Sequence, residues 1–318
     1  MNEIIINPSS GREILDFRLL GFCDVLVLGR YFYREARLPL QLHEHGNFLE
    51  ICYLAEGQQF YCVGNKDYLL NGGDVLINYP HELHGTGGFH EGKGNLYWMI
   101  LNPPNSQTEF LGMSYGNGIL LYENLLQIPS RQFKLKTGSQ KNLEWIFNAF
   151  NKKRNSVIKT EIKEADSGYF EFSSNGSNVF FLMNMRNYLL RFLLDVVESG
   201  QLRCRVDISD CIQHVMDQIK MNDETFYTMK QLAKIAGLSE SRFKHRFKEE
   251  TGTTPADYQL RYKIDRACNM LIDDKETILN TALSLGFSSS QYFATVFRRY
   301  MGIPPMKYLT MKSPEYNG

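Results

Sequence analysis

The sequence predicts an α+β protein of more than one domain, with an N-terminal β-barrel plus helices and a C-terminal all-α domain that holds two helix-turn-helix motifs. The chain has 318 residues, which is enough for about two domains of ordinary size. Short strand-like runs fill residues 17–101, whereas helical patterns dominate from residue 142 onward. The last third contains an internal repeat of helix-turn-helix length.

Composition describes a folded protein that carries little net charge. Hydrophobic residues make up 43% of the chain, and 35 Lys and Arg balance 35 Asp and Glu. Taken alone, this balance argues against a nucleic-acid binder. The N-terminus has no signal-peptide pattern, and charged residues interrupt the most apolar stretch, residues 179–197. The six cysteines form no CxxC pair, so we expect a cytoplasmic protein with reduced thiols and no membrane partner.

The β-rich part consists of several runs of strand length that are rich in β-branched and aromatic residues. They are residues 24–33, 48–57, 59–63, 68–70, 74–80 and 95–101. Residues 64–67, Gly-Asn-Lys-Asp, have the composition of a hairpin turn. Many short strands at close spacing predict a sandwich or a barrel.

Two helices are expected next, at residues 143–153 and at residues 178–200, with a polar loop at 159–177 between them and a linker at 200–205. The longer helix carries an apolar stripe at near-heptad spacing. The stripe packs against the barrel, forms a homodimer seam, or does both. Its residues are Phe181, Met185, Leu189, Phe192 and Val196, with Leu182, Leu193 and Val197 beside them.

The internal repeat relates residues 232–258 to residues 281–308. Each copy predicts a helix, a turn in which glycine supplies a positive φ, and a second helix capped by serine. Two phenylalanines four residues apart share the buried face of each second helix. The matching pairs are Ala233 and Ala282, Gly237 and Gly286, Ser239 and Ser288, Phe243 and Phe293, Phe247 and Phe297, Gly252 and Gly302, Pro255 and Pro305, and Tyr258 and Tyr308.

Polar and basic side chains surround the buried phenylalanines of each second helix. Short polar groups near a helix start can reach base edges, and basic groups further along can reach phosphates. The first copy therefore carries a local basic face, so the zero net charge of the whole chain does not exclude DNA binding. The DNA-binding candidates are Ser241, Arg242, Lys244, His245, Arg246 and Lys248 in the first copy, and Ser289, Ser290, Gln291, Thr295 and Arg298 in the second.

Residues 209–312 resemble the AraC-type family of transcription factors. The resemblance rests on the pattern A-x-x-x-G-x-S, then F-x-x-x-F-K-x-x-x-G-x-x-P, and on the second block ending F-x-x-x-x-G-x-x-P-x-x-Y. It implies a seven-helix domain with a long central helix at residues 255–272, and each second helix in a major groove. It assigns base reading to Ser241, Lys244, His245, Ser290, Gln291 and Thr295, and phosphate contact or packing to Arg246, Lys248 and Arg298.

The N-terminal half is similar to the cupin family in the pattern H-x-H-x4-E-x6-G, which starts at His43. The resemblance implies a small barrel around a ligand pocket. In metal-binding cupins the corresponding residues, here His43, His45, Glu50 and His84, hold a divalent metal. We expect no metal and no cofactor, with these side chains contacting a ligand directly; a metal site is the alternative. Tyr61 and Trp98 complete the ligand-binding candidates, because either ring could stack on a sugar or pack in the core.

These observations predict a bacterial, ligand-responsive transcription factor rather than an enzyme. Residues 1–135 form the cupin-like sensor, 136–200 a helical dimerisation and connector region, and 207–313 the AraC-type DNA-binding domain. The expected partners are double-stranded promoter DNA, a small-molecule effector of carbohydrate class, a second copy of the chain and, for an activator, RNA polymerase; the expected location is the nucleoid. The alternatives are a metal-dependent cupin enzyme of the isomerase or dioxygenase class and a helical interaction protein that binds no DNA.

Overall fold

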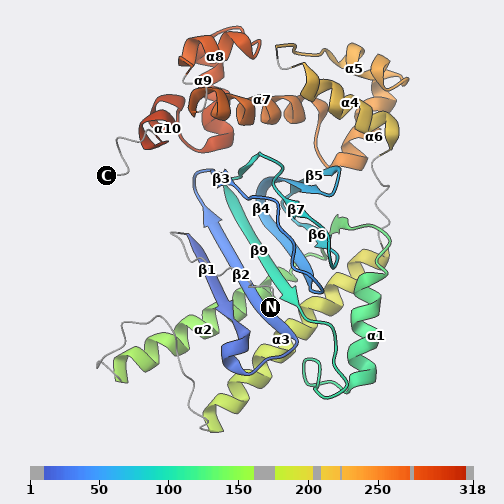
Figure 1. Cartoon of the computed structure of the whole chain (residues 1–318), viewed down its shortest axis with the longest axis vertical. Helices are drawn as coiled ribbons and strands as arrows, with labels where there is room; N and C mark the ends of the chain where they lie inside the picture. The colour runs from blue at the N-terminus through green and yellow to red at the C-terminus, as the bar shows by residue number, and fades with distance from the viewer. Residues whose placement is uncertain (1–10, 161–175, 203–208, 223, 273–275, 313–318) are drawn as a thin grey trace.

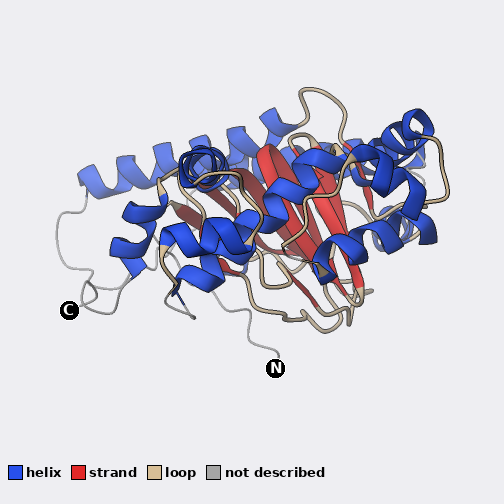
Figure 2. Cartoon of the chain, turned by 90° about the horizontal axis from the view of Figure 1, so that it is seen from above, coloured by secondary structure: helices blue, strands red, loops and turns tan. Residues whose placement is uncertain are grey.

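A computed structural model describes residues 11–160, 176–202, 209–222, 224–272 and 276–312 (Figure 1). It confirms the α+β class, with a sheet and three helices in the N-terminal half and helices alone after residue 209. The C-terminal helices cover one end of the strands (Figure 1), and helices lie in front of the sheet when the molecule is seen from above (Figure 2). In the described residues, no helix is long and apolar enough to cross a membrane.

An antiparallel sheet forms the N-terminal half. Its neighbouring strands, in spatial order, are β1 (Arg12–Asp16), β2 (Val25–Tyr33), β9 (Gly94–Leu101), β4 (Leu49–Val63), β6 (Asp74–Asn78) and β10 (Gln132–Lys134). A short 3-10 helix, η1 (Phe17–Leu20), joins β1 to β2. The second half of β4 pairs with β5 (Lys66–Asn71) and β7 (His84–Gly85). A separate ribbon pairs β3 (Arg37–Pro39) with β8 (His90–Glu91).

Strand β4 bends the sheet toward a barrel. Its first half pairs with β6 and β9, its second half pairs with β5 and β7, and the register with β9 shifts between Leu54 and Glu56. Gly57 follows the shift with φ 99°, and a Cβ there would collide with the carbonyl oxygen of Lys93. The predicted hairpin is present, but its turn is shorter than expected because β5 begins at Lys66, which pairs with Val63.

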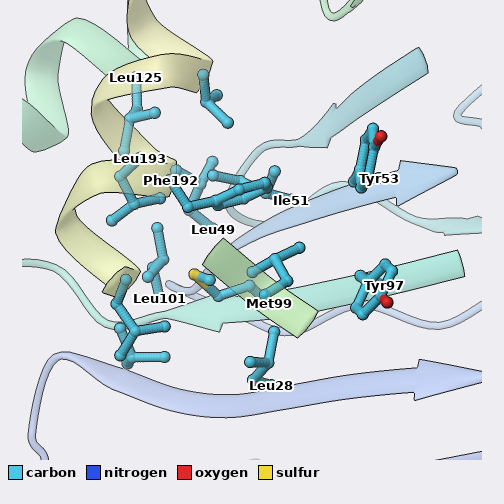
Figure 3. Close-up of a cluster of buried hydrophobic side chains, with 14 of the residues drawn as sticks. Leu28, Leu49, Ile51, Tyr53, Tyr97, Met99, Leu101, Leu125, Phe192 and Leu193 are labelled. Carbon is cyan, nitrogen blue, oxygen red and sulfur yellow. The ribbon is translucent and has the colours of Figure 1, made fainter. Parts of the chain in front are cut away.

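Side chains alternate between two buried regions along the strands, as the pleat requires. One face packs against α1 (Tyr115–Leu126), α2 (Gln140–Thr160) and α3 (Gly176–Leu202), and Figure 3 shows Ile51, Met99 and Phe192 within that core. The opposite face, which carries Leu96 and Trp98, points into the barrel. Helix α1 was not predicted from the sequence.

The apolar stripe of α3 packs against the sheet, which confirms that interpretation of the helix. The side chains of Met185, Leu189, Phe192 and Val196 are at most 1% exposed. They are therefore unavailable for a homodimer seam, so a dimer needs another face. The predicted linker at 200–205 is wrong at its start because α3 continues to Leu202. The predicted loop at 159–177 is wrong at both ends because α2 ends at Thr160 and α3 begins at Gly176. Residues 161–175 and 203–205 lie outside the described residues.

Seven described helices form the C-terminal half, as the resemblance implied. They are α4 (Asp210–Met221), α5 (Met229–Ile235), α6 (Glu240–Thr251), α7 (Pro255–Ile272), α8 (Ile278–Ser284), α9 (Ser290–Met301) and α10 (Pro305–Lys312). Helix α7 runs between the α4–α6 unit and the α8–α10 unit (Figure 1). Each unit has its own apolar core, and side chains of α7 contribute to both.

The two halves share these cores. Phe60 and Phe89 of the barrel belong to the α4–α6 core, and the Phe60 ring lies 5.5 Å from that of Tyr258. Ala36, just before β3, belongs to the α7–α10 core, and its N–H donates to the carbonyl oxygen of Met301. The barrel and the C-terminal helices are therefore packed together.

Polar contacts between the halves centre on β8. The backbone N–H of His90 donates to Asp265 at 3.1 Å, and Arg261 donates to the His90 carbonyl oxygen at 3.1 Å. The His90 ring meets the Tyr308 hydroxyl at 2.7 Å. Arg261 and Asp265 are 2% and 3% exposed, so this network is buried and α7 is fixed to the ribbon at this point.

Candidate ligand cavity and nucleic-acid interface

The barrel encloses a cavity of about 490 Å³, a size typical of small-molecule sites. Alternation along β2 and β9 turns Val27, Trp98 and Ile100 into it. The predicted ligand residues His43, His45, Glu50, Tyr61 and Trp98 all line the cavity. His84 lies beside them and is buried. The structure thus brings the predicted cluster together.

Trp98 takes its position because glycine stands opposite it. Gly29 pairs with Trp98 across β2 and β9, and a Cβ at position 29 would collide with the indole ring. The guanidinium of Arg12 lies 5.1 Å from the centre of the same ring, a cation–π contact. Trp98 is half-buried and lines the cavity, so its ring belongs to the cavity wall rather than to the outer core.

Arg12 and Glu91 form an ion pair in the cavity wall that the sequence did not indicate. The guanidinium donates to the carboxylate at 2.9 Å, and Glu91 is buried. Burial raises the pKa of Glu91 above its ordinary value, and the attraction of Arg12 opposes this shift without cancelling it. Neither residue lies in a recognisable motif, because β1 and β8 are far apart in the chain.

The histidines form a compact cluster with one carboxylate. His43, His45 and His84 each place a ring nitrogen within 4.8 Å of the others. Glu50 lies between two of them, with one oxygen 3.0 Å from Nε2 of His84 and the other 3.6 Å from Nε2 of His45. Asn78 donates to Glu50 at 2.7 Å and orients the carboxylate.

Backbone carbonyls fix two of these rings. Nδ1 of His43 lies 2.9 Å from the carbonyl oxygen of Gln41, and Nδ1 of His84 lies 2.8 Å from that of Glu82. A carbonyl oxygen only accepts, so each Nδ1 carries the proton, and each Nε2 is left for another partner. Nε2 of His45 and Nε2 of His84 are buried, and each faces an oxygen of the Glu50 carboxylate, at 3.6 Å and 3.0 Å.

The cluster perturbs the pKa values of its members. Burial disfavours the charged form of Glu50, but hydrogen bonds from His45 and His84 outweigh it and hold the pKa of this carboxyl well below its ordinary range. Burial lowers the pKa of His43. Burial also favours the neutral form of the His84 ring, but the hydrogen bond and the attraction to Glu50 outweigh it and raise the pKa of this ring. The cluster therefore holds an ionised carboxylate inside a largely apolar cavity.

Helix α6 presents the first predicted DNA-binding face. Ser239 caps the helix, accepting from the N–H of Arg242, while Phe243 and Phe247 are fully buried. Arg246 is half-buried and its Nε donates to the buried Glu250 at 2.6 Å. The remaining predicted side chains of this helix are exposed, namely Ser241, Arg242, Lys244, His245 and Lys248.

Helix α9 presents the second face, with one correction to the repeat. The capping serine is Ser289, which accepts from the N–H of Tyr292, and not Ser288. The additional residue of the second copy therefore lies in the turn before the helix. Tyr292 is 46% exposed in the first turn of α9 and was not among the candidates. Ser290 is half-buried, and Gln291, Thr295 and Arg298 are exposed.

Comparison with known proteins agrees with this arrangement. Residues 30–144 match the family model of the AraC-like ligand binding domain, and residues 232–311 match that of a helix-turn-helix domain. The chain belongs to the AraC family of transcriptional regulators. The first model covers most of the barrel, and the second covers both predicted DNA-binding helices of this AraC-family regulator.

Among the relatives of this AraC-family chain is the HTH-type transcriptional activator RhaS of Enterobacter sp. strain 638, which is 21% identical over 275 residues, 85% of this chain and 89% of that protein. The probable transcriptional regulator LumQ of Photobacterium leiognathi is 29% identical over 154 residues, 48% of this chain and 57% of its own length. The crystal structure of ToxT from Vibrio cholerae O395 aligns with a TM-score of 0.33 and 10% identity over 96% of this chain and 100% of ToxT. The first two relatives are named as regulators, which supports a regulatory role over an enzymatic one.

Proposed function

We propose that this AraC-family regulator binds promoter DNA through α6 and α9 and responds to a small molecule held in the barrel cavity. The observation that carries the proposal is the joint between the barrel and the C-terminal helices, which His90 and Asp265 form. Glu91 lines the cavity, and its neighbour His90 contacts Asp265 of α7, the helix that links the two helix-turn-helix units. A ligand that favours one arrangement of this joint shifts the population of DNA-binding states.

A carbohydrate is the effector class that we propose. Trp98 offers an aromatic face for the apolar side of a sugar ring, and Gln41, Glu44 and the histidines offer donors and acceptors for hydroxyl groups. The cavity volume suits a ligand of this size. The direct contacts proposed for this ligand are to His43, His45, Glu50, Tyr61, His84 and Trp98.

On DNA, we assign base contacts to Ser241, Lys244 and His245 of α6 and to Ser290, Gln291 and Thr295 of α9. Arg242, Lys248, Ser289 and Arg298 then face the phosphates, where basic and hydroxyl groups position the protein without reading sequence. Arg246 already pairs with Glu250, so we assign it to packing of α6 with only a secondary phosphate contact.

Dimerisation would increase avidity for a two-part site. Because the α3 stripe is buried, we propose that a second copy contacts the exposed side chains at the start of this helix. Val179, Phe180 and Met183 are between 52% and 71% exposed there in the described part of the chain. RNA polymerase is a further partner if the protein activates transcription.

Genome-wide footprinting with the purified protein tests the DNA-binding proposal, because it needs no knowledge of the effector. We expect discrete protected sites upstream of genes, with protection weakening as salt rises. A parallel thermal-shift panel of mono- and oligosaccharides tests the effector class, since a ligand that binds only the folded state raises Tm. Stabilisation by another metabolite class and by no sugar would reject the carbohydrate; absence of protected sites would reject the DNA-binding role.

A further inference from the structure

We propose that Lys263 and Gly286 fix the two helix-turn-helix units relative to each other and thereby determine which DNA spacing the protein accepts. The spacing is the number of base pairs between the two short DNA segments, here called subsites, that α6 and α9 contact. The inference therefore rests on the proposed function. Its basis is a direct contact between the units, in addition to α7, which joins them along the chain.

The segment between α4 and α5 reaches from the first unit into the second. Tyr227 packs against the core of the α4–α6 unit, whereas its neighbour Phe226 packs against the core of the α7–α10 unit. The Phe226 ring meets the Phe287 ring edge-on, with 5.2 Å between their centres. Gln259 of α7 holds the segment in place, because it accepts from the N–H of Tyr227 at 2.9 Å and donates to its carbonyl oxygen at 3.2 Å.

Lys263 ties the two sides of this contact together. It lies in the middle of α7 and is 1% exposed. Its Nζ donates at 2.9 Å to the carbonyl oxygen of Leu285, which follows α8, and lies 4.4 Å from the centre of the Phe226 ring. A buried ammonium group is costly unless polar or aromatic groups face it. One side chain therefore holds the turn of the second unit against a ring of the first.

Gly286 permits the closest approach between the units. It lies in the turn before α9 with φ 75°, and a Cβ there would collide with the carbonyl oxygen of Glu224. The equivalent glycine of the first unit, Gly237, has φ 67°, but a Cβ there would meet nothing within 4 Å. Both turns need a left-handed backbone, whereas only the second turn also needs room for the other unit.

A fixed pair of units accepts a fixed spacing. One base pair added between the subsites moves the second subsite by about 3.4 Å and turns it by roughly 35°. Units that cannot move relative to each other then lose contacts of α6 or α9, or must deform the DNA. Units with a loosened contact can follow the displaced subsite. Discrimination between spacings therefore reports on the contact between the units, which a loss of overall stability would not change.

The test compares binding of the full chain to a protected site and to duplexes that are one base pair longer or shorter between the two segments shielded from hydroxyl radicals. We expect the wild type to bind each altered duplex at least about tenfold more weakly, which corresponds to about one lost base contact. Lys263→Met keeps an apolar stem and removes the ammonium group, and Gly286→Ala forces the turn away from Glu224. In both variants we expect this ratio to fall below about threefold.

Gly237→Ala is the matched control, because alanine meets the same backbone strain there without touching the other unit. It should keep the wild-type ratio. Phe226→Leu provides a further variant in case Lys263→Met does not fold, since it removes the aromatic face and keeps an apolar side chain, and it should also lower the ratio.

Unchanged discrimination by folded Gly286→Ala and by folded Lys263→Met or Phe226→Leu would overturn the inference. A wild type that binds all three spacings equally, or a Gly237→Ala variant that loses discrimination as fully as Gly286→Ala, would overturn it as well. In each of these cases DNA binding itself stands. A wild type that protects no site would instead reject the proposed function, and the inference would fall with it.

Discussion

Lys244 and His245 are adjacent on α6 and both are exposed. The His245 ring lies 3.5 Å from Glu249, one turn further along the same helix, and its side chain is 80% exposed. An exposed side-chain contact of this kind is weak, so it does not prevent the ring from turning toward a base. These two side chains are therefore the most direct test of α6 as a recognition helix.

The double variant Lys244→Ala/His245→Ala should bind its specific sites more weakly, by about 1–3 kcal/mol for each base that is no longer recognised. Quantitative footprinting on a protected site measures the weakening. Lys141→Ala, an exposed lysine of α2 far from the helix-turn-helix units, serves as the charge-matched control and should bind normally. Identical protection by the double variant would exclude these residues from sequence reading.

Glu91 gives a prediction for pH. Because burial raises its pKa above the ordinary 4.5, the folded state holds this proton more tightly than the unfolded chain does. The associated stability is present below the unfolded pKa and is lost as pH rises through the higher, folded pKa. In urea denaturation, the stability of the wild type relative to Glu91→Gln should fall across this window and then level off.

The control for this pH profile is Glu123→Gln, an exposed glutamate of α1, whose stability difference from the wild type should stay nearly constant. A wild-type chain that gained stability over Glu91→Gln as pH rose would contradict the assignment. Such a result would mean that Arg12 dominates burial and lowers the pKa of Glu91.

The candidate site was only partly predictable from the sequence. His43, His45 and Glu50 stand close together in a spaced motif, and the cupin resemblance added His84, so their meeting was foreseeable. Alternation along a strand turns Trp98 inward. Arg12 and Glu91 are 79 residues apart, and their pairing depends on β1 adding to the sheet edge beside β2. No local pattern encodes such a contact.

Among the elements, the two helix-turn-helix units were predicted because their signals are local: a glycine turn, a capping serine and paired phenylalanines. Helix α1 was missed because it begins Tyr-Gly-Asn-Gly, and glycine and asparagine are poor helix formers. Tertiary packing explains one of these glycines, since a Cβ on Gly118 would collide with Phe110. Strand β1 was missed because its charged residues, such as Arg12 and Glu13, suit an exposed sheet edge.

Helix α3 provides an internal comparison between buried and exposed leucines. Leu189 is fully buried against the sheet, whereas Leu194 is 39% exposed. Leu189→Ala should lower the free energy of unfolding by about 2–5 kcal/mol, measured by urea denaturation. Leu194→Ala is the matched control and should cost less than about 1 kcal/mol. Equal destabilisation by both variants would mean that Leu194 is covered, as at an interface with a second copy.

At the scale of the whole molecule, the sequence divided the chain into separate parts, but the parts share their cores. Phe60 and Ala36 of the N-terminal half are buried among C-terminal helices. The sequence predicted a strand at residues 59–63, which includes Phe60, but no local pattern could show against which element that side chain packs. The joint between the halves, centred on His90 and Asp265, was therefore found only in the structure.

The joint can be tested because both tryptophans of the chain, Trp98 and Trp145, lie in the N-terminal half. Asp265→Ala leaves the His90 N–H and the Arg261 guanidinium without their buried acceptor and should cost about 3–5 kcal/mol. If the halves unfold together, the substitution in α7 should shift the tryptophan fluorescence transition as much as the circular dichroism transition. Asp210→Ala, at an exposed position of α4, should shift neither by more than about 1 kcal/mol.

A fluorescence midpoint unmoved by Asp265→Ala, with a lower circular dichroism midpoint, would show that the C-terminal half unfolds independently. The packed cores around Phe60 and Ala36 argue for the cooperative result.

Strand β8 is only two residues long, and those residues point to opposite sides. Glu91 faces the cavity and Arg12, while His90 faces α7 and Tyr308. The cavity and the C-terminal helices are therefore separated at this point by a single peptide unit. An effector that draws Arg12 away from Glu91 needs no relay of intervening side chains, because the backbone that it disturbs is the backbone that α7 holds.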